Sequence, residues 1–179
     1  MHLEAIIALK TLSDAKRRLS ADLSDEARES LVEAMALDVI AALSASPAIT
    51  AVHVICGDGW AQLEELPAPV RVWREPDEHN GGLVGALEWV AGQVNSDASL
   101  FVHGDLPFID TTDIASLVLA AASESVVVCP DRSQTGTNAL LRWQSQSLPL
   151  AFGENSYARH LAAITSAGLH FHEVSTMGL

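Results

Sequence analysis

Short apolar runs alternate with longer stretches of helical period along this chain of 179 residues. The runs are rich in Val, Ile and Leu at both odd and even positions, which is typical of strands buried on both faces of a sheet. Their alternation with helices predicts an α/β fold, in which a mostly parallel sheet is covered by helices on both faces. The expected strands are Ala5–Leu9, Ala51–Cys56, Val70–Trp73, Ser99–His103, Ser125–Cys129, Ala139–Arg142 and Leu169–Val174.

The clearest helix should begin after Ser24, whose hydroxyl is a suitable N-cap, and should end before Pro47. Asp25 and Glu26 would stabilise its first turn, because the amino end of a helix carries partial positive charge. Apolar residues at helical spacing should form its buried face. They are Leu31, Val32, Met35, Val39, Ala42 and Leu43.

Three shorter helices are expected farther along the chain. They are Gly82–Val94, then Thr112–Ser123 with Thr111 or Thr112 as its cap, and Tyr157–Ala167 with Ser156 as its cap. In sheets of this kind, ligands bind outside the carboxyl ends of the strands. The segments that directly follow the strands are therefore the candidates for chemistry.

The composition predicts one acidic, soluble, cytoplasmic domain spanning residues 1–179. With 10 Lys and Arg against 23 Asp and Glu, the formal net charge is −13, which would repel nucleic acid and anionic membranes. No uncharged apolar run approaches the roughly 20 residues of a membrane helix, and Glu4 stands where a secretory signal would carry positive charge. Cys56 and Cys129 are too few for a disulfide framework, and we expect both to be buried as small apolar residues.

Positive charge gathers directly after the first strand. Four of the ten basic residues, Lys10, Lys16, Arg17 and Arg18, fall within positions 10–18. Such side chains neutralise phosphate oxygens; the alternative is a solvated basic turn. The chain has neither a GxGxxG nor a Walker sequence, so any phosphates would be held by side chains.

Asp105 is the candidate metal ligand. It follows a buried strand in the segment His103-Gly104-Asp105-Leu106-Pro107, where the glycine permits close approach and the carboxylate suits a hard cation such as magnesium. The alternative is an aspartate that caps its own turn. For His103 we favour a partly buried histidine with satisfied hydrogen bonds over a ligand.

Two later segments offer small hydrogen-bond donors. Gly136-Thr137-Asn138 lies at a bend between two expected strands, and Gly153-Glu154-Asn155-Ser156 leads into the last helix. Arg159 and His160 would lie one turn into that helix, and Phe152 is expected in the core. His170 and His172 share a face of the last strand but lack a third ligand, so we expect them in solvent.

Taken in order, these segments resemble the 2-phospho-L-lactate or phosphoenolpyruvate guanylyltransferases of deazaflavin-cofactor biosynthesis. The family pattern of a lysine and AKxRL is matched by Lys10 and Ala15–Leu19, and its DLP by Asp105-Leu106-Pro107. Its PDR and GTNAL are matched by Pro130–Arg132 and Gly136–Leu140, and its FGxxSxxRH by Phe152–His160. The resemblance covers nearly the whole chain and implies a single nucleotidyltransferase-type (Rossmann-like) domain.

The chain departs from the family pattern at two places. Gly82-Leu83-Val84 stands where the family usually has Gly-Leu-Asn, so a nucleotide contact of that asparagine would be missing. The family also ends with Asp-Ile-Asp-Thr-Pro, whose aspartates join the DLP aspartate around metal, whereas this chain ends at Met177-Gly178-Leu179. Either the chain is truncated or its metal site is incomplete.

The resemblance implies that GMP is transferred from GTP to a small three-carbon phosphoacid, with release of pyrophosphate. It assigns Lys10, Lys16 and Arg18 to catalysis and, with Gly82 and Asp105, to the nucleotide, and it assigns Asp105 to Mg²⁺. The residues left for the acceptor are Thr137, Asn138, Gly153 and Ser156, with Arg159 and His160 as supporting candidates.

The acceptor could be 2-phospholactate, phosphoenolpyruvate or 3-phosphoglycerate, and a homo-oligomer is compatible with this assignment. Two alternatives stay open: a nucleotidyltransferase acting on molybdopterin or a sugar phosphate, and a non-catalytic nucleotide-binding domain without the full metal site.

Overall fold

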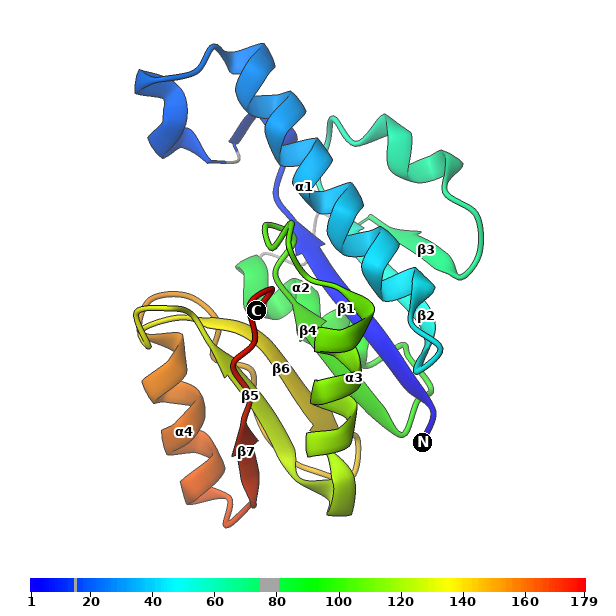
Figure 1. Ribbon diagram of the computed structural model, residues 1–179, viewed down its shortest axis with the longest axis vertical. Helices are drawn as coiled ribbons and strands as arrows, with labels where there is room; N and C mark the ends of the chain where they lie inside the picture. The colour runs from blue at the N-terminus through cyan, green and yellow to red at the C-terminus, as the bar shows by residue number, and fades with distance from the viewer. Residues whose placement is uncertain (15, 75–80) are drawn as a thin grey trace.

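The computed structural model describes residues 1–14, 16–74 and 81–179. Within these residues the strands are β1 (Leu3–Leu9), β2 (Ile49–Cys56), β3 (Val70–Trp73), β4 (Ala98–Val102), β5 (Val126–Pro130), β6 (Thr137–Trp143) and β7 (Phe171–Glu173). They form one sheet in the order β3-β2-β1-β4-β6-β5-β7 (Figure 1). The expected strands are all present, with ends that differ by one or two residues.

The sheet is mostly parallel, as predicted, with β6 as the reversed strand. β1 pairs in parallel with β2 and β4, β2 with β3, and β5 with β7, whereas β6 is antiparallel to both β4 and β5. The reversal follows from chain length, because residues 131–136 form a turn too short for a parallel crossover. The first residue of β6 therefore lies at the edge where the other strands end.

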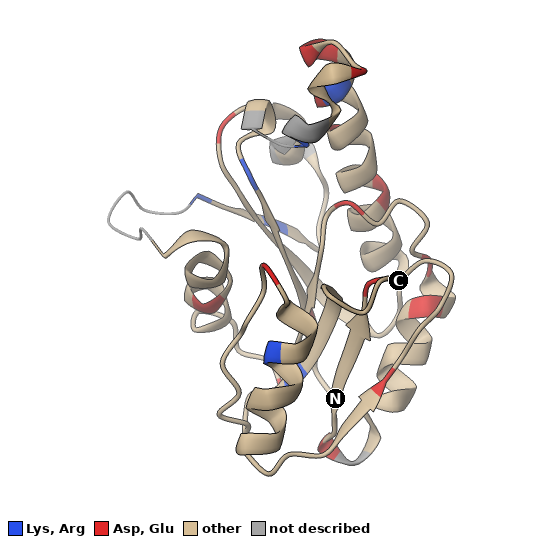
Figure 2. Cartoon of the chain, turned by 90° about the vertical axis from the view of Figure 1, so that its left-hand side faces the viewer, with Lys and Arg blue, Asp and Glu red and all other residues tan. Residues whose placement is uncertain are grey.

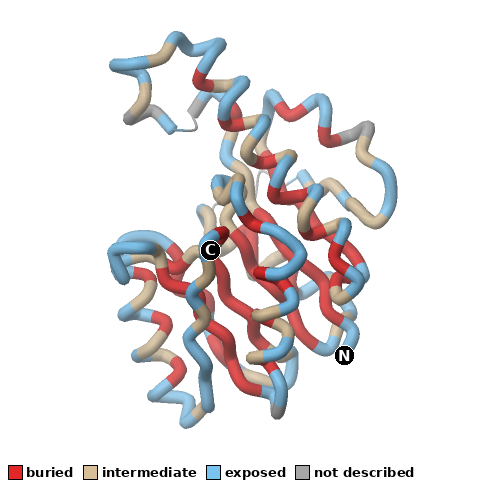
Figure 3. Tube along the Cα trace, in the orientation of Figure 1, coloured by how far each residue is buried: buried red, intermediate tan, exposed pale blue. Residues whose placement is uncertain are grey.

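Helices cover both faces of the sheet, also as predicted. They are α1 (Asp25–Ala45), α2 (Gly82–Ala91), α3 (Thr111–Ala120) and α4 (Ser156–Ser166). α1 and α3 pack with Leu3, Ala5 and Ile7 of β1, whereas α2 and α4 belong to the core that contains Ile6. This division follows from the alternation of side chains along a strand, and Figure 3 shows buried residues running along the strands between the two layers.

The start and end of α1 match the prediction. Ser24 Oγ accepts a hydrogen bond from the Ala27 amide at 3.2 Å, and the helix ends at Ala45. Its buried face differs at Leu31, which is 40% exposed, because that residue lies about 100° around the helix from Val32. The residues that do form the buried stripe are Arg28, Val32, Ala36, Val39, Ile40 and Leu43.

Two predicted helix caps were wrong. The cap of α3 is Asp110, whose carboxylate accepts from the amides of Thr112 and Asp113 while Asp113 accepts from the Asp110 amide. The cap of α4 is Asn155, in the left-handed region at φ 52°, without a side-chain bond to the helix. Ser156 is instead the first residue of that helix, and its hydroxyl bonds to the start of β6.

No helix in the described parts of the chain has both the length and the apolar character to cross a membrane. In the view of Figure 2, acidic residues are spread over the helices and loops, and the basic residues drawn in blue stand singly rather than as a continuous face. Cys56 and Cys129 are both buried, as predicted, and are not joined in a disulfide. Burial raises the pKa of the Cys129 thiol to about 12, so it stays protonated near neutral pH.

Candidate functional site

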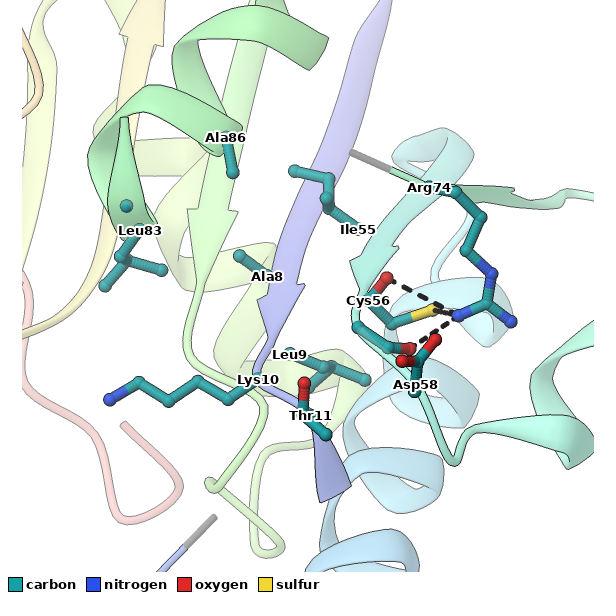
Figure 4. Close-up of a pocket in the computed structure, with 12 residues that line it drawn as sticks. Ala8, Leu9, Lys10, Thr11, Ile55, Cys56, Asp58, Arg74, Leu83 and Ala86 are labelled. Atoms are coloured by element: carbon teal, nitrogen blue, oxygen red, sulfur yellow. Dashed lines mark hydrogen bonds between the residues drawn. The ribbon is translucent and has the colours of Figure 1, made fainter. Parts of the chain in front are cut away.

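A cavity of about 520 Å³ opens at the carboxyl ends of β1 and β2. Its wall comes from the ends of these strands and the residues after them, from the residue after β3, and from the first turns of α2 (Figure 4). The lining residues are Ala8, Leu9, Lys10, Thr11, Ile55, Cys56, Gly57, Asp58, Arg74, Gly82, Leu83 and Ala86. The volume falls in the range of small-molecule and cofactor sites.

Two cations flank this cavity, with Lys10 on one side and Arg74 on the other (Figure 4). The Arg74 Nη1 donates to the carbonyl oxygens of Gly57 at 2.6 Å and Cys56 at 3.4 Å. The Trp60 Nε1 donates to the Lys10 carbonyl oxygen at 2.7 Å, which fixes the backbone where the Lys10 side chain begins. The cavity therefore has a cationic side chain on each side.

Gly82, expected at the nucleotide, is the first residue of α2 and lines the cavity. Its φ of +60° is in the left-handed region, which glycine adopts without steric cost. Within the described residues no side chain caps this end of α2, so the unpaired amides of its first turn add partial positive charge beside the cavity.

Asp105 pairs with Lys16 at the end of β4. The Lys16 ammonium donates to Asp105 Oδ2, and the two side chains are 40% and 39% exposed. Burial alone would raise the pKa of the Asp105 carboxyl, but the bond to Lys16 and the charges of Lys16 and His103 outweigh it and lower the pKa. The sequence had not predicted this ion pair, since it joins residues assigned separately to phosphate and to metal.

The local backbone accounts for how these two residues meet. A Cβ on Gly104 would lie 2.3 Å from Leu9 Cδ2, so a larger residue where the end of β4 passes β1 would require the Leu9 side chain to move. Lys16 adopts φ 50°, which is uncommon for a residue with a side chain. Ala15 and the side chain of Arg18 lie outside the described part of the structure, although the backbone of Arg18 belongs to the 3-10 helix Arg17–Ala21.

Among the described residues, no group of three or more His, Cys, Asp or Glu side chains could share a metal ion. A Cβ on Gly178 would lie 2.6 Å from the Phe108 carbonyl oxygen, so the chain segment 174–179 packs beside the loop after Asp105. That segment supplies no carboxylate side chain. A single carboxylate such as Asp105 suits a divalent cation that takes its other ligands from water or further oxygen donors, as magnesium commonly does.

Thr137 and Ser156, two of the predicted acceptor residues, lie in contact. The Thr137 amide donates to Ser156 Oγ at 2.8 Å, and the Thr137 Oγ1 lies 2.9 Å from Nδ1 of His160. Thr137 and Ser156 are only 1% and 2% exposed. An acceptor can therefore contact these hydroxyls only if the residues around them move locally.

His160 occupies the centre of this group and is fully buried. Its Nε2 accepts from the Ala151 amide at 2.9 Å, and its ring packs edge-on against Phe152 with centroids 5.0 Å apart. Burial, with the nearby charges of Arg159 and His103, lowers the pKa of His160 to about 4. The imidazole is therefore neutral near neutral pH.

His103 joins this group to Asp105. Its ring packs edge-on against Phe152 with centroids 5.4 Å apart, and its backbone amide donates to the Asn138 carbonyl oxygen at 3.0 Å. Burial lowers the pKa of its imidazole, although the charge of Asp105 and a bond to the Thr137 backbone act in the opposite direction. The expectation of a partly buried histidine is confirmed.

The other expected acceptor residues surround this group. Gly153 is exposed at φ +114°, and among the described residues only its own chain neighbours lie within 4 Å of where a Cβ would stand. Arg159 is exposed in the first turn of α4, and Asn138 is half-buried in β6. The edge of the sheet thus runs from the cavity at β2 and β1, past Asp105 after β4, to Thr137 at the start of β6.

Sequence reasoning missed Arg74 and Asp58 in the cavity wall and gave His160 only a supporting role. The signal for the first two was available, because each follows a strand at the ligand-binding edge. No comparable signal marks His160, because its partners are fixed by the packing of α4 on the sheet. His170 and His172 are exposed, as predicted.

Comparison with known proteins places this chain in a family. Residues 3–174 match the family described as "Guanylyl transferase CofC like". A phosphoenolpyruvate guanylyltransferase of Sphaerobacter thermophilus is 33% identical over 177 residues, which cover 98% of this chain and 84% of that protein.

Solved structures show the same fold at low sequence identity. One match is the crystal structure of a protein from Desulfovibrio desulfuricans that is provisionally assigned as a nucleotide-diphospho-sugar transferase. Its TM-score is 0.77 and its sequence identity is 14%, over 98% of this chain and 80% of the other. A Mycobacterium tuberculosis protein solved in complex with manganese has a TM-score of 0.53 and 13% identity, over 98% and 89% of the two chains. This chain belongs to the CofC-like guanylyltransferase family and is a nucleotidyltransferase.

Proposed function

We propose that this enzyme transfers GMP from GTP to the phosphate of a three-carbon phosphoacid, as a step in the synthesis of a deazaflavin cofactor. Phosphoenolpyruvate is the preferred acceptor in this proposal. The observation that carries this proposal is the order of groups along one sheet edge. From β2 towards β6 along this edge, the cavity with Lys10 comes first, the Lys16–Asp105 pair second, and the buried Thr137 and Ser156 third. The names of the similar proteins support the acceptor.

The reaction needs two anions to be brought together. An oxygen of the acceptor phosphate attacks the α-phosphorus of GTP, a new P–O bond forms, and the bond from the α-phosphorus to the bridging oxygen of the β-phosphate breaks. Pyrophosphate leaves with that electron pair. The acceptor phosphate is ionised at neutral pH, so the protein needs to supply positioning and positive charge more than a base.

Each group of residues has a role in this scheme. Lys10, Lys16 and Arg18 neutralise the phosphates of GTP, and the amino end of α2 at Gly82 adds partial positive charge. Asp105 would hold a magnesium ion together with phosphate oxygens, and a bound magnesium would neutralise charge that develops on them. Thr137, Asn138, Gly153, Ser156 and Arg159 bind the acceptor.

The base is guanine in this proposal, because the cavity wall offers acceptors. Asp58 with its carboxylate lines the cavity, and the carbonyl oxygens of Cys56 and Gly57, which accept from Arg74, each have a second lone pair. Guanine presents an N1–H and an amino group at one edge, which need such acceptors, whereas adenine has no N1–H. The assignment does not require the asparagine that Val84 replaces relative to the family pattern.

The deciding experiment is pyrophosphate release from GTP and Mg²⁺ with phosphoenolpyruvate, 2-phospholactate or 3-phosphoglycerate. We expect turnover with at least one acid, phosphoenolpyruvate being the best. Molybdopterin and glucose 1-phosphate serve as acceptors of other classes. Turnover with one of these and with no three-carbon acid would refute the proposal, as would release that does not depend on any acceptor.

A further inference from the structure

The His160 imidazole ties together three segments beside the start of β6. Its Nδ1 lies 2.9 Å from Thr137 Oγ1 in β6, and its Nε2 lies 2.9 Å from the backbone nitrogen of Ala151, while the ring itself belongs to α4. The side chain is fully buried. The contacts with Thr137 and Ala151 give each ring nitrogen a protein partner.

These two contacts determine which nitrogen carries the proton. The backbone N–H of Ala151 can only donate, so Nε2 must be the nitrogen without a hydrogen. A neutral imidazole has one N–H, which must then be on Nδ1 and be donated to Thr137 Oγ1. The Thr137 hydroxyl thus accepts this bond, and its own hydrogen is left for another partner.

Ser156 is in the same situation. Its Oγ accepts from the backbone N–H of Thr137 at 2.8 Å, so its hydroxyl hydrogen is also left over. Within the described residues, neither hydroxyl has a second hydrogen-bond partner. Buried hydroxyl hydrogens without an acceptor are unfavourable, and two neighbouring ones suit an anionic oxygen.

We propose that His160 is a positioning residue for the acceptor: by donating from Nδ1 to Thr137, it leaves the hydroxyl hydrogens of Thr137 and Ser156 to be donated together to one anionic group of the phosphoacid, once the residues that bury these hydroxyls have moved aside. This inference rests on the proposed function. It deepens that function by naming a residue that acts without touching substrate. It also gives a role to a neutral histidine that is buried against the Phe152 ring.

The first test needs no turnover. Nitrogen-15 NMR of the full chain with labelled histidine, at pH 7 and without ligand, should show His160 with a protonated Nδ1 and a bare Nε2. The His160→Asn variant identifies the signal by its loss. A proton on Nε2, or on both nitrogens, would overturn the inference whatever the enzyme's activity.

The second test separates the two bonds of the imidazole. Asn places an amide nitrogen near the position of Nδ1 and can still donate to Thr137, whereas Gln places its carbonyl oxygen near Nε2 and can keep only the bond to Ala151. We expect His160→Gln to raise the KM for phosphoenolpyruvate about tenfold, the effect of losing one oriented hydrogen bond. His160→Asn should recover most of this loss, and the KM for GTP should change less than about twofold in both variants.

Controls distinguish positioning from general damage to the fold. His172→Asn, on the exposed strand β7, should leave both KM values unchanged. In the Thr137→Val background, adding His160→Gln should have no further effect on the KM for phosphoenolpyruvate. Equal losses in the Asn and Gln variants, or additive losses in the double variant, contradict the inference.

The possible failures are distinguishable. If the unaltered protein turns over no phosphoacid, the proposed function is wrong and this inference is wrong with it. If the protein is active but His160 has the other tautomer, or if only the KM for GTP responds, the inference alone is wrong. Should the Gln variant fail to fold, the NMR measurement and the Asn variant still decide.

Discussion

The Asp105 carboxylate, to which we propose that magnesium binds, is paired with the Lys16 ammonium, and both side chains are more than a third exposed. Exposed ion pairs of this kind contribute about 0–1 kcal/mol to stability. The pair therefore contributes little to stability, and under the proposed function the loss of the Asp105 charge should affect the reaction more than the fold.

We predict that Asp105→Asn lowers kcat/KM for guanylyl transfer by about 100-fold or more, because the amide keeps the shape and loses the charge. The melting temperature should change by less than about 2 °C. Pyrophosphate release and thermal unfolding measure the two effects, with Asp38→Asn on the exposed side of α1 as the control. An Asn variant with full activity and unchanged magnesium dependence would show that Asp105 only caps its turn.

His160 should also make stability depend on pH. Its pKa is about 4 in the folded protein and about 6.5 when unfolded, so the unfolded state binds more protons between these values. The free energy of unfolding should therefore fall as pH drops from about 6.5 to about 4, by up to about 3 kcal/mol from this residue. Above pH 7 its contribution is constant.

Urea unfolding at pH 7, 6, 5 and 4.5 measures this dependence. Burial also lowers the pKa of His53 and His103, so the residue-specific signal is the difference in slope between the unaltered protein and His160→Gln. The variant should lose less stability on acidification. Identical slopes would mean that His160 has an ordinary pKa in the folded protein.

At the scale of elements, the start of α3 shows how local chemistry selects among neighbouring candidates. Asp110, Thr111, Thr112 and Asp113 are all residue types that occur at helix starts. Asp110 is the cap because its carboxylate accepts two amide bonds, at 2.7 and 2.9 Å, while Asp113 returns a third. The sequence indicated the start of α3 to within three residues, but it did not determine which residue is the cap.

We expect Asp110→Ala to lower the free energy of unfolding by about 1–2 kcal/mol, because both amide bonds are lost. Thr111→Ala is the matched comparison and should cost less than about 0.5 kcal/mol, since Thr111 makes no capping bond. Chemical denaturation of both variants tests this. A larger loss of unfolding free energy for Thr111→Ala than for Asp110→Ala would mean that Thr111 is the cap, as the sequence predicted.

At the scale of the whole molecule, the sheet and its two helical layers could be predicted because their pattern repeats along the chain. Lys10 and Asp105 could be proposed as site residues because each follows a strand, which is a local signal. The Lys16–Asp105 pair and the bonds of His160 could not, since they join residues 89 and 23 positions apart. Leu31 was misplaced because apolar residues surround α1 on more than one side.

The predicted nucleotide preference belongs to this scale, because the cavity takes its wall from four elements. Thermal shift with Mg²⁺ and each nucleotide should show a larger rise in melting temperature for GTP than for ATP or CTP. At 100 times the Kd, a ligand adds about 2.7 kcal/mol to the stability of the folded state. Equal shifts for all three would remove the guanine assignment.

Because β6 runs antiparallel to its neighbours, the length of the turn before it determines the face of the sheet on which Thr137 lies. Asp131 closes that turn through bonds to Ser133 and Thr135, and its backbone amide donates to the Gly136 carbonyl oxygen. Successive side chains of a strand point to opposite faces, so one residue inserted between Asp131 and Thr137 and carried into the strand would turn Thr137 away from His160. Insertions in the surface loops between helices and parallel strands have no such effect. Variation in length among natural or engineered relatives should therefore be tolerated around the sheet and be strictly limited at residues 131–136.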